Sequence, residues 1–484
     1  MKRLAYYFAM LSSAISFVVM LLWSDIMSGD FYIIIFYPLL YGFFLLLIWP
    51  DMLRRQGGAK ITVGIFLVIQ WLRLVALPAL GSASGYFKVA GHNIDGESAQ
   101  TAAYLVLYET IATFIAAFLL LRWKSKKVPL QQDVNQSMEL SGNGSVYMLF
   151  IILAAFLFLR NGADQYAFFV LNLSEEHRVG FEADGGNAIP AIIDYGLTML
   201  VVMLLYYCYR KYQKTGRKSY VYASLLIALL RICIIDADSD GRLAILYPTG
   251  ALLLLLPKLY NKHRKLIINS IAIVGIIVVL YMTVYKTFYA FLYDSYLQAI
   301  QNNANEFDMY EYAKQLDIYF YGVRTIAQNI YVSQRLDLSI VNLFLDYTRN
   351  TFGIHYLIRD TVGTTVAQYN LYIYHGEQMN GYLYSSLAYG ATYFSVILAP
   401  LMTIGNMVIV AAIENWLRRI KGMDGYYIVS IVFVRMAYNM FCCFPLAWNY
   451  ASRTLILGAI VIGGASLIKT KQYSRSAPER IYKA

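Results

Sequence analysis

Long apolar runs recur along the whole chain and constrain its fold more than any other feature. Short connectors or polar stretches separate twelve such runs. A helix needs about 20 apolar residues to cross the roughly 30 Å hydrocarbon core of a bilayer. The runs occupy residues 4–23, 31–49, 61–80, 101–121, 146–159, 189–209, 220–235, 242–256, 266–285, 389–413, 426–444 and 454–467. The sequence therefore predicts an all-α polytopic membrane protein with about twelve transmembrane helices.

The composition supports the same class of protein. Hydrophobic residues make up 59% of the chain and charged residues only 14%, whereas soluble domains are about 25% charged. The runs at 146–159, 220–235 and 242–256 are short for a bilayer, so we expect those helices to extend past a charged residue. We expect the first run to be an anchor helix and not a cleaved signal peptide.

The distribution of charge along the connectors predicts the orientation in the membrane. Alternate connectors, together with both termini, hold most of the 40 lysines and arginines but only six of the 29 acids. Those six are Asp51, Asp133, Glu139, Glu414, Asp424 and Glu479. Cytoplasmic loops of membrane proteins are enriched in lysine and arginine, so both termini are expected in the cytoplasm. The same rule explains the net charge of +11 without a nucleic-acid partner.

The stretch from 286 to 386 is the one long segment without a membrane-length apolar run. It is rich in tyrosine and carboxylates and carries scattered arginine and histidine. The charge pattern places this stretch outside the cytoplasm, before the last three helices. We expect a large, partly helical extracytoplasmic loop within a single integral membrane domain of residues 1–484. A polar loop of this size is more typical of a functional surface than of a simple connector.

Arginines within or beside the apolar runs are the main candidates for chemistry. Arg73 and Arg435 lie inside predicted spans, and Arg231, Arg242 and Arg453 lie at predicted outer ends. Guanidinium groups match phosphate oxygens bidentately, so such a set could form an anion site. Simpler interpretations remain open. Arg73 could pair with Glu109 on the next helix, Arg231 could pair with Asp236 or Asp238, and Arg453 could lie at the level of the lipid headgroups.

Two segments of the large loop carry further candidates. His375 and Glu377 lie beside glycines immediately before a predicted span. A histidine can accept a hydroxyl proton at neutral pH, and a carboxylate can orient it or replace it as the base. His375 could equally be a hydrogen-bonded loop residue. In segment 344–360, Asp346 and Arg349 share a helical face and could form an ordinary salt bridge.

Several residue types have simpler interpretations. The tyrosines of the loop could stack on sugar rings or form an interfacial aromatic belt. The four cysteines all lie in apolar segments and predict neither a disulfide framework nor a metal site. The chain carries no motif for nucleotide hydrolysis or for the common hydrolases, and we expect no cofactor.

Two local patterns resemble one known family. The segment SDGRLAILYPTGALLLL at 239–255 resembles the glycine-arginine turn that leads into an apolar helix in Wzy-type oligosaccharide repeat-unit polymerases. The segment NGYLYSSLAYGATYFSVILAP at 380–400 resembles their passage from the large outer loop into the next helix. These are the polymerases of O-antigen and capsular polysaccharide, with about a dozen helices and one large late outer loop. The resemblance covers the topology of the chain and about forty residues of its sequence.

The resemblance implies a function for the arginines. Members of the family are thought to hold a lipid pyrophosphate with arginines on the outer side. This implies Arg242 first, and Arg349, Arg73 and Arg435 by charge and placement. The expected function is a glycosyltransferase of the bacterial plasma membrane that polymerises undecaprenyl-pyrophosphate-linked oligosaccharides, with a flippase and a chain-length regulator as expected partners. The alternative is a flippase or transporter of the same lipid-linked oligosaccharides.

Overall fold

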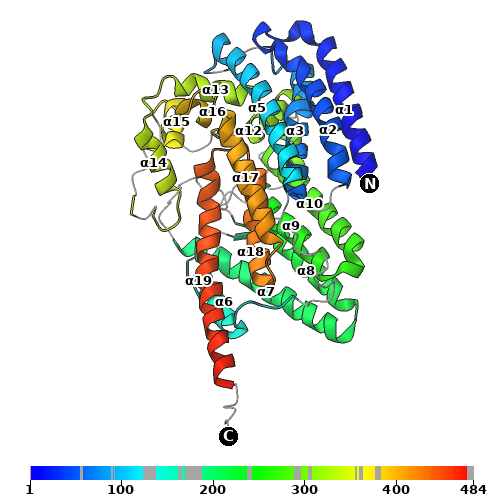
Figure 1. Cartoon of the computed structure of the whole chain (residues 1–484), viewed down its shortest axis with the longest axis vertical. Coiled ribbons are helices and arrows are strands. Elements are labelled where there is room, and N and C mark those ends of the chain that lie inside the picture. Colours follow the sequence, from blue (N-terminus) through cyan, green and yellow to red (C-terminus); the bar gives the residue numbers. More distant parts are fainter. Residues whose placement is uncertain are drawn as a thin grey trace. The chain divides into compact units, whose positions relative to one another are not determined.

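The apolar runs form helices in the computed structural model of the chain (Figure 1). The structure describes residues 2–54, 58–88, 91, 93–123, 138–161, 166–168, 188–236, 242–287, 296–303, 308–354, 357–358, 363–376 and 383–476. Within these ranges, seven helices are long and apolar enough to cross a membrane, and three shorter apolar helices accompany them. The described chain is thus a helical membrane protein, whereas the number of twelve spans stays a prediction.

Contacts divide the chain into two compact units, which are described separately. Unit 1 comprises residues 1–128, 305–416 and 435–449, and unit 2 comprises the remainder. The helices of unit 1 are α1 (Lys2–Leu22), α2 (Tyr37–Arg54), α3 (Lys60–Trp71), α4 (Leu77–Ala83), α5 (Gly96–Arg122), α12 (Met309–Tyr319), α13 (Val323–Ser333), α14 (Ile340–Arg349), α15 (Thr365–Ile373), α16 (Ser386–Tyr393) and most of α17 (Pro400–Leu417).

Unit 2 contains α6 (Gly144–Asn161), α7 (Ala188–Thr215), α8 (Ser219–Cys233), α9 (Arg242–Leu259), α10 (Arg264–Thr287) and α11 (Tyr296–Asn302), with most of α18 (Met423–Tyr438) and α19 (Phe444–Ser476). Neighbouring helices from α6 to α10 pack against each other in sequence order. Two short strands, β1 (Tyr166–Phe168) and β2 (Ile234–Asp236), pair antiparallel with Tyr166 opposite Asp236. The predicted short runs at 146–159 and 242–256 do extend past charges, to include Arg160 in α6 and Lys258 in α9. The same prediction was wrong for the run at 220–235, because α8 ends at Cys233.

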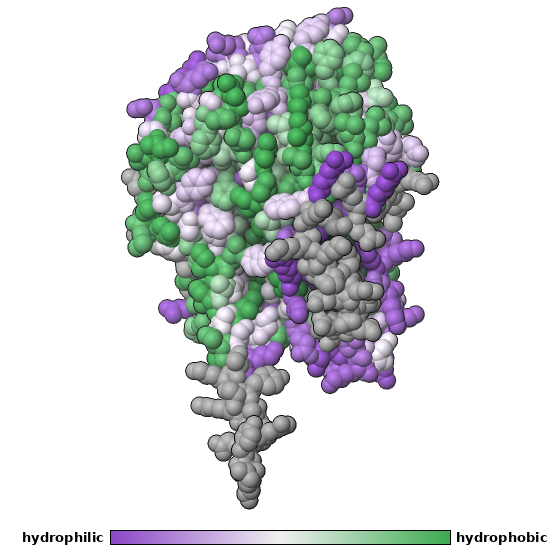
Figure 2. All heavy atoms as spheres, in the orientation of Figure 1, coloured by the Kyte–Doolittle hydropathy of each residue, from purple (hydrophilic) through white to green (hydrophobic). Residues whose placement is uncertain are grey.

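Helix α1 exposes much of its apolar surface. Leu4, Phe8, Leu11 and Ile15 are all more than half exposed, and Figure 2 shows apolar side chains over the surface of this part of unit 1. A soluble protein would bury these side chains, and a contiguous apolar surface of this kind is typical of a lipid-facing helix. The inner sides of the helices build an aromatic core, in which Phe44 and Phe114 stack at 4.7 Å between ring centroids.

The predicted span at 389–413 is broken in the structure. Helix α16 ends at Tyr393, and α17 begins at Pro400 after a series of turns. Proline has no amide hydrogen and is favoured in the first turn of a helix, where that hydrogen has no partner. Gly390 allows the chain to fold back closely, because a Cβ at this position would overlap the carbonyl oxygen of Ala399. The spanning helix is therefore shorter than the apolar run.

Part of the large polar stretch folds back among the apolar helices of unit 1. Helices α12 and α13 form a hairpin in which α12 packs against α4 and α13 against α5. Tyr321 lies in the connecting turn with a φ of 53°, and its carbonyl oxygen accepts a 2.8 Å hydrogen bond from Nε of Arg73. Arg73 lies near the middle of the apolar helix Lys60–Ala83. The tip of this hairpin thus reaches the middle of a candidate span.

Two acids predicted on the cytoplasmic side lie at helix N-termini, Glu414 at the start of α3 and Asp424 in the first turn of α18. In unit 1, Glu414 accepts hydrogen bonds from the amides of Ile61 and Thr62 at the start of α3, at 3.2 and 2.8 Å. In unit 2, Asp424 accepts hydrogen bonds from the amide and hydroxyl of Ser141 and from the hydroxyl of Tyr147, at 2.6 to 2.9 Å. Carboxylates near helix N-termini are stabilising because they complement the partial positive charge there.

Candidate functional site

Arg73 forms a buried ion pair with Glu109. Arg73 lies in a short π-helical segment, Leu72–Ala76, between α3 and α4, and Glu109 lies on α5. Nη1 of Arg73 is 2.6 Å from Oε2 of Glu109, and each side chain is 1% exposed. The sequence offered this internal pair as one of two interpretations, and the pair is confirmed.

Further groups contact this pair, although Nη1 of Arg73 and Oε2 of Glu109 make no hydrogen bond of normal geometry with the described residues. Thr403 donates a hydrogen bond to Oε1 of Glu109, and the guanidinium group of Arg73 lies over the ring of Phe441 at 4.7 Å from its centroid. With the bond to the Tyr321 carbonyl, the guanidinium is bound on two sides and stacked on a third. An anion could reach Arg73 only by displacing these groups. The pair connects α4, α5 and the α12–α13 hairpin. Its net charge is zero.

The other predicted residues of unit 1 lie on different elements. Arg349 ends α14, where its Nη1 donates a 2.8 Å hydrogen bond to the carbonyl of Ile358. Arg435 lies half-buried on α18. His375 is exposed and has a φ of 52° in the turn that ends α15. Glu377 lies outside the described residues. The proposed acid–base pair of His375 and Glu377 therefore stays a prediction.

Asp346 is the best-connected carboxylate of the polar stretch. It is 2% exposed on α14 and accepts hydrogen bonds from the amide and hydroxyl of Thr365 and from the hydroxyl of Tyr389 at 3.0 Å. Its described partners are therefore these two residues and not Arg349, with which a salt bridge was predicted. Burial raises the pKa of Asp346 above its usual value, and the hydrogen bonds from Thr365 and Tyr389 act in the opposite direction.

Unit 2 brings together two of the arginines that the sequence singled out. Nη2 of Arg231, near the end of α8, lies 3.5 Å from Oδ1 of Asp194. Nη2 of Arg453, on α19, lies 3.9 Å from Oδ2 of the same carboxylate. We refer to Asp194, Arg231 and Arg453 as the arginine cluster. Among the described residues one carboxylate faces two guanidinium groups, so these three side chains together carry one uncompensated positive charge.

Two polar groups at the cluster have no hydrogen-bond partner among the described residues. These are Nε of Arg231 and the hydroxyl of Tyr427 on α18, both buried. The hydroxyl of Tyr427 is close enough to interact electrostatically with both Arg231 and Asp194. Buried donors in proteins are nearly always paired. Unpaired donors beside an excess of positive charge are suited to binding an anion, which supplies both acceptors and negative charge.

The cluster remains accessible from outside the unit. The side chains of Arg453 and Asp194 are 29% and 37% exposed, whereas that of Arg231 is 12% exposed. Asp194 lies near the start of α7 and Arg231 near the end of α8, and the two helices are consecutive and packed together. The three side chains therefore gather at one end of this helix pair.

Arg242 begins α9 at the same end of the unit. Strand β2 follows α8 directly and contacts α9, so the backbone returns Arg242 toward the end of α8 that carries Arg231. The side chain of Arg242 lies outside the described atoms, as do Asp236 and Asp238, the partners predicted for Arg231. The described partners of Arg231 are Asp194 and the carbonyl oxygen of Ile234, which accepts a 3.2 Å hydrogen bond from Nη1 of Arg231.

Sequence reasoning missed two members of this site. Asp194 lies inside the apolar run 189–209, and a lone carboxylate within a span is itself a signal of a buried partner. Tyr427 had no such signal, because the chain has 44 tyrosines and any of them could face lipid or a headgroup. Only the electrostatic interaction of its hydroxyl with Arg231 and Asp194 in the structure distinguishes it.

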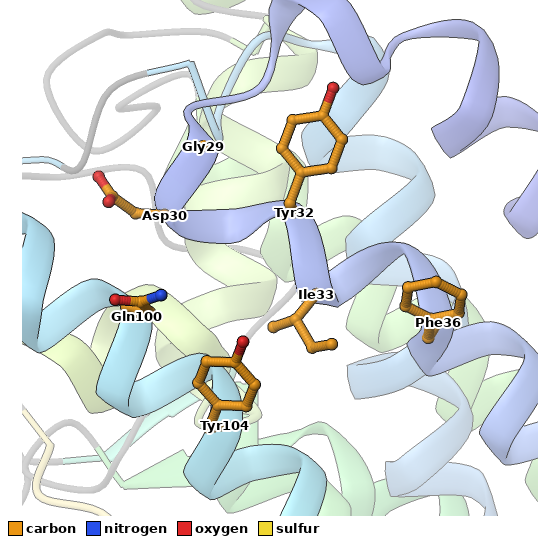
Figure 3. A pocket seen from close by; sticks show the side chains of 7 residues that line it. All are labelled: Gly29, Asp30, Tyr32, Ile33, Phe36, Gln100 and Tyr104. Carbon is orange, nitrogen blue, oxygen red and sulfur yellow. The ribbon is translucent and has the colours of Figure 1, made fainter.

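A hollow on unit 1 differs from the arginine cluster in its charge, because the residues described in its lining include a carboxylate and no arginine (Figure 3). Its lining comes from the 3₁₀ segment Gly29–Phe36 and from the first turns of α5, with Asp30, Gln100 and Tyr104 around it. Asp30 accepts a 3.0 Å hydrogen bond from Ser28. A carboxylate at the rim disfavours a phosphate ligand, and none of the predicted site residues lies there.

The chain matches no protein-family model, no curated protein and no solved structure. Its function is therefore argued from its own residues.

Proposed function

We propose that the chain is a membrane glycosyltransferase that polymerises undecaprenyl-pyrophosphate-linked oligosaccharide repeat units on the outer face of the bacterial plasma membrane. In this proposal about twelve helices cross the bilayer, and both termini face the cytoplasm. The single observation that carries the proposal is the arginine cluster with its uncompensated positive charge and unpaired donors. A pyrophosphate supplies what this cluster lacks, because its oxygens accept several hydrogen bonds and carry negative charge.

In this proposal the cluster binds the headgroup of a lipid carrier. Asp194 and Arg231 lie near ends of apolar helices that the charge pattern predicts on the outer side, and Arg453 lies in the third turn of α19. A lipid pyrophosphate positions its charge at this level of a bilayer. We assign its binding to Arg231, Arg453 and Arg242 in preference to Arg73, whose charge is neutralised by Glu109 in a buried pair.

The chemistry that these residues would support is a glycosyl transfer. The bond between the anomeric carbon and the pyrophosphate oxygen breaks, and its electron pair leaves with the lipid pyrophosphate. The acceptor hydroxyl forms the new bond to that carbon and gives its proton to a general base, which we predict from the sequence alone to be His375 or Glu377. Fixed positive charge that stabilises the departing anion lowers the barrier, as preorganised electrostatic groups do in other enzymes. The donor is already activated, so the reaction needs no nucleotide sugar.

A polymer-length assay in the native host tests this proposal. The chromosomal gene is replaced by variants with Arg231→Ala, Arg453→Ala or both, and surface polysaccharide is separated by size. We expect the double variant to lose long polymer and to accumulate single lipid-linked units on the outer face. Arg217→Ala is the matched control, because Arg217 is exposed and follows the opposite end of α7.

The location of the accumulated units distinguishes the two candidate functions. Units that remain on the cytoplasmic face after gene deletion would indicate a flippase or transporter instead. Normal chain length in the double variant, at wild-type protein abundance, would remove the arginine cluster from the mechanism.

A further inference from the structure

Helix α14 has its apolar side chains on the outside and its polar side chains on the inside. Ile340, Val341 and Phe344 are 59%, 60% and 66% exposed, whereas Asn342 and Asp346 are 7% and 2% exposed. At 100° per residue, the exposed apolar residues occupy one side of the helix and the buried polar residues the other. This is the reverse of a helix on a water-facing surface. We refer to Ile340, Val341, Phe344 and Tyr347 as the apolar face of α14.

The inward polar side chains are fully engaged. Nδ2 of Asn342 donates a 2.6 Å hydrogen bond to the carbonyl of Gly363, and its Oδ1 accepts one from the amide of Ser339 at 2.7 Å. Asp346 accepts hydrogen bonds from Thr365 and Tyr389. These contacts fix the rotation of the helix, because turning it inward by half a turn would break them all. The apolar face is therefore held outward.

The end of α14 is bound to the start of a spanning helix. Nε1 of Trp448 donates a 3.1 Å hydrogen bond to the hydroxyl of Thr351, and Nδ2 of Asn449 donates one of 3.2 Å to Oδ1 of Asn350. The ring of Tyr347 lies 5.9 Å from that of Phe444. Phe444, Trp448 and Asn449 form the first turns of α19, which is a candidate span from Phe444 to Lys469.

These contacts place α14 at the edge of the bilayer. A candidate span starts at Phe444, and tryptophan is enriched at the level of the lipid headgroups. An exposed apolar face at that depth would contact lipid. Arg349 lies at the polar end of the helix, where a long cationic side chain can remain in the headgroup layer.

We propose that α14 is an interfacial helix whose apolar face inserts into one leaflet of the membrane that the chain spans. The partner of this face is the bilayer itself, at the boundary between headgroups and acyl chains. Beyond α14, Leu357 is 84% exposed and Ile354 is 40% exposed, which extends the apolar surface. The proposal rests on burial and contacts within unit 1 and does not depend on the glycosyltransferase assignment. It makes the polar stretch 286–386 a partly membrane-bound segment.

Spin-label accessibility of the full-length protein in vesicles tests this proposal. Cysteine is introduced at Val341 or Phe344, and for comparison at Lys314, which is exposed on the polar helix α12. The unsubstituted protein, treated in the same way, corrects for labelling of the native cysteines. The vesicles contain phosphatidylethanolamine and phosphatidylglycerol, with a water-soluble nickel chelate on both sides. Collision with oxygen, which concentrates in lipid, is compared with collision with the chelate.

The comparison has three distinct outcomes. We expect the ratio of oxygen to nickel collisions to be several-fold higher at positions 341 and 344 than at 314. High nickel accessibility at all three positions would show that the apolar face contacts water and would overturn the proposal. Low accessibility to both reagents at 341 and 344 would show that protein covers the face, such as a second copy of the chain, and would also overturn it.

Discussion

Nη1 of Arg73 and Oε2 of Glu109 are 2.6 Å apart and sealed from solvent, with each side chain 1% exposed. The two residues lie on neighbouring helices of unit 1, and the same guanidinium binds the carbonyl of Tyr321 at the tip of the α12–α13 hairpin. One side chain therefore joins three elements that are far apart in the sequence.

Arg73→Ala should strongly destabilise the protein. The substitution leaves the Glu109 carboxylate buried without its counter-charge, and breaking a buried pair in this way costs about 3–5 kcal/mol. The free energy of unfolding, followed by denaturation in detergent, measures the loss. The double variant Arg73→Met with Glu109→Gln removes both charges and should recover much of the stability. Wild-type stability of Arg73→Ala alone would contradict the structural role of the pair.

Gly322→Ala should loosen the hairpin tip. A Cβ at this position would overlap Oδ1 of Asp317 and Cδ2 of Leu77, and neither group can move away easily because both are buried. Overpacking of this kind costs about 1–3 kcal/mol. Melting temperature and protease resistance measure the effect. Gly405→Ala is the control, because a Cβ there meets no atom within 4 Å, and it should be neutral or stabilising.

Asp346 should make stability depend on pH. Burial raises the pKa of Asp346 in the folded state, so the folded protein binds this proton more tightly than the unfolded chain does. The resulting stabilisation is fully present below the usual aspartate pKa of about 4 and is lost as pH rises through the folded-state pKa. Within that window the slope from one proton is at most about 1.4 kcal/mol per pH unit.

Substitution of Asp346 isolates its contribution to this pH dependence. In Asp346→Asn the unfolding free energy should vary less between pH 4 and pH 8 than it does in the wild type. Asp337→Asn, at an exposed position of the same stretch, should leave the wild-type profile intact. Parallel profiles for Asp346→Asn and the wild type would assign the dependence to other groups.

Tyr427→Phe should separate stability from activity. The Tyr427 hydroxyl is buried and has no hydrogen-bond partner among the described residues, and such a group costs about 1–3 kcal/mol. Removing it should leave the melting temperature unchanged or raised. If the hydroxyl donates to a lipid pyrophosphate, the same variant should nevertheless shorten the surface polymer. A normal polymer with a raised melting temperature would exclude the hydroxyl from ligand binding.

Much of the helical framework can be predicted from the sequence, because hydropathy reports burial in lipid directly. The runs at 61–80 and 101–121 coincide closely with the helices Lys60–Ala83 and Gly96–Arg122. The prediction of a single span at 389–413 was wrong. The apolar character of this run is continuous, whereas its helix is interrupted before Pro400. Hydropathy does not distinguish a straight helix from two helices joined by apolar turns.

Partners of the charged residues are harder to predict. The Arg73–Glu109 pair could be predicted from the sequence, because spans that follow one another in the chain must pack together. The pairing of Arg231 with Asp194 could not be predicted, because acids closer to Arg231 in the sequence were equally good candidates. The sequence also does not predict that the polar side of α14 faces inward. The exposed apolar residues of this helix have the spacing that is usual for a buried face. Sequence periodicity identifies two sides of a helix but not which one faces inward.

The position of the α12–α13 hairpin has a consequence for biogenesis. Residues 60–122 are synthesised and inserted well before residues 309–333, and the hairpin tip binds at Arg73, in the middle of the earlier helix. We therefore expect the later segment to dock against helices that are already in the bilayer. A chain truncated before residue 309 would leave the Arg73–Glu109 pair without its third partner.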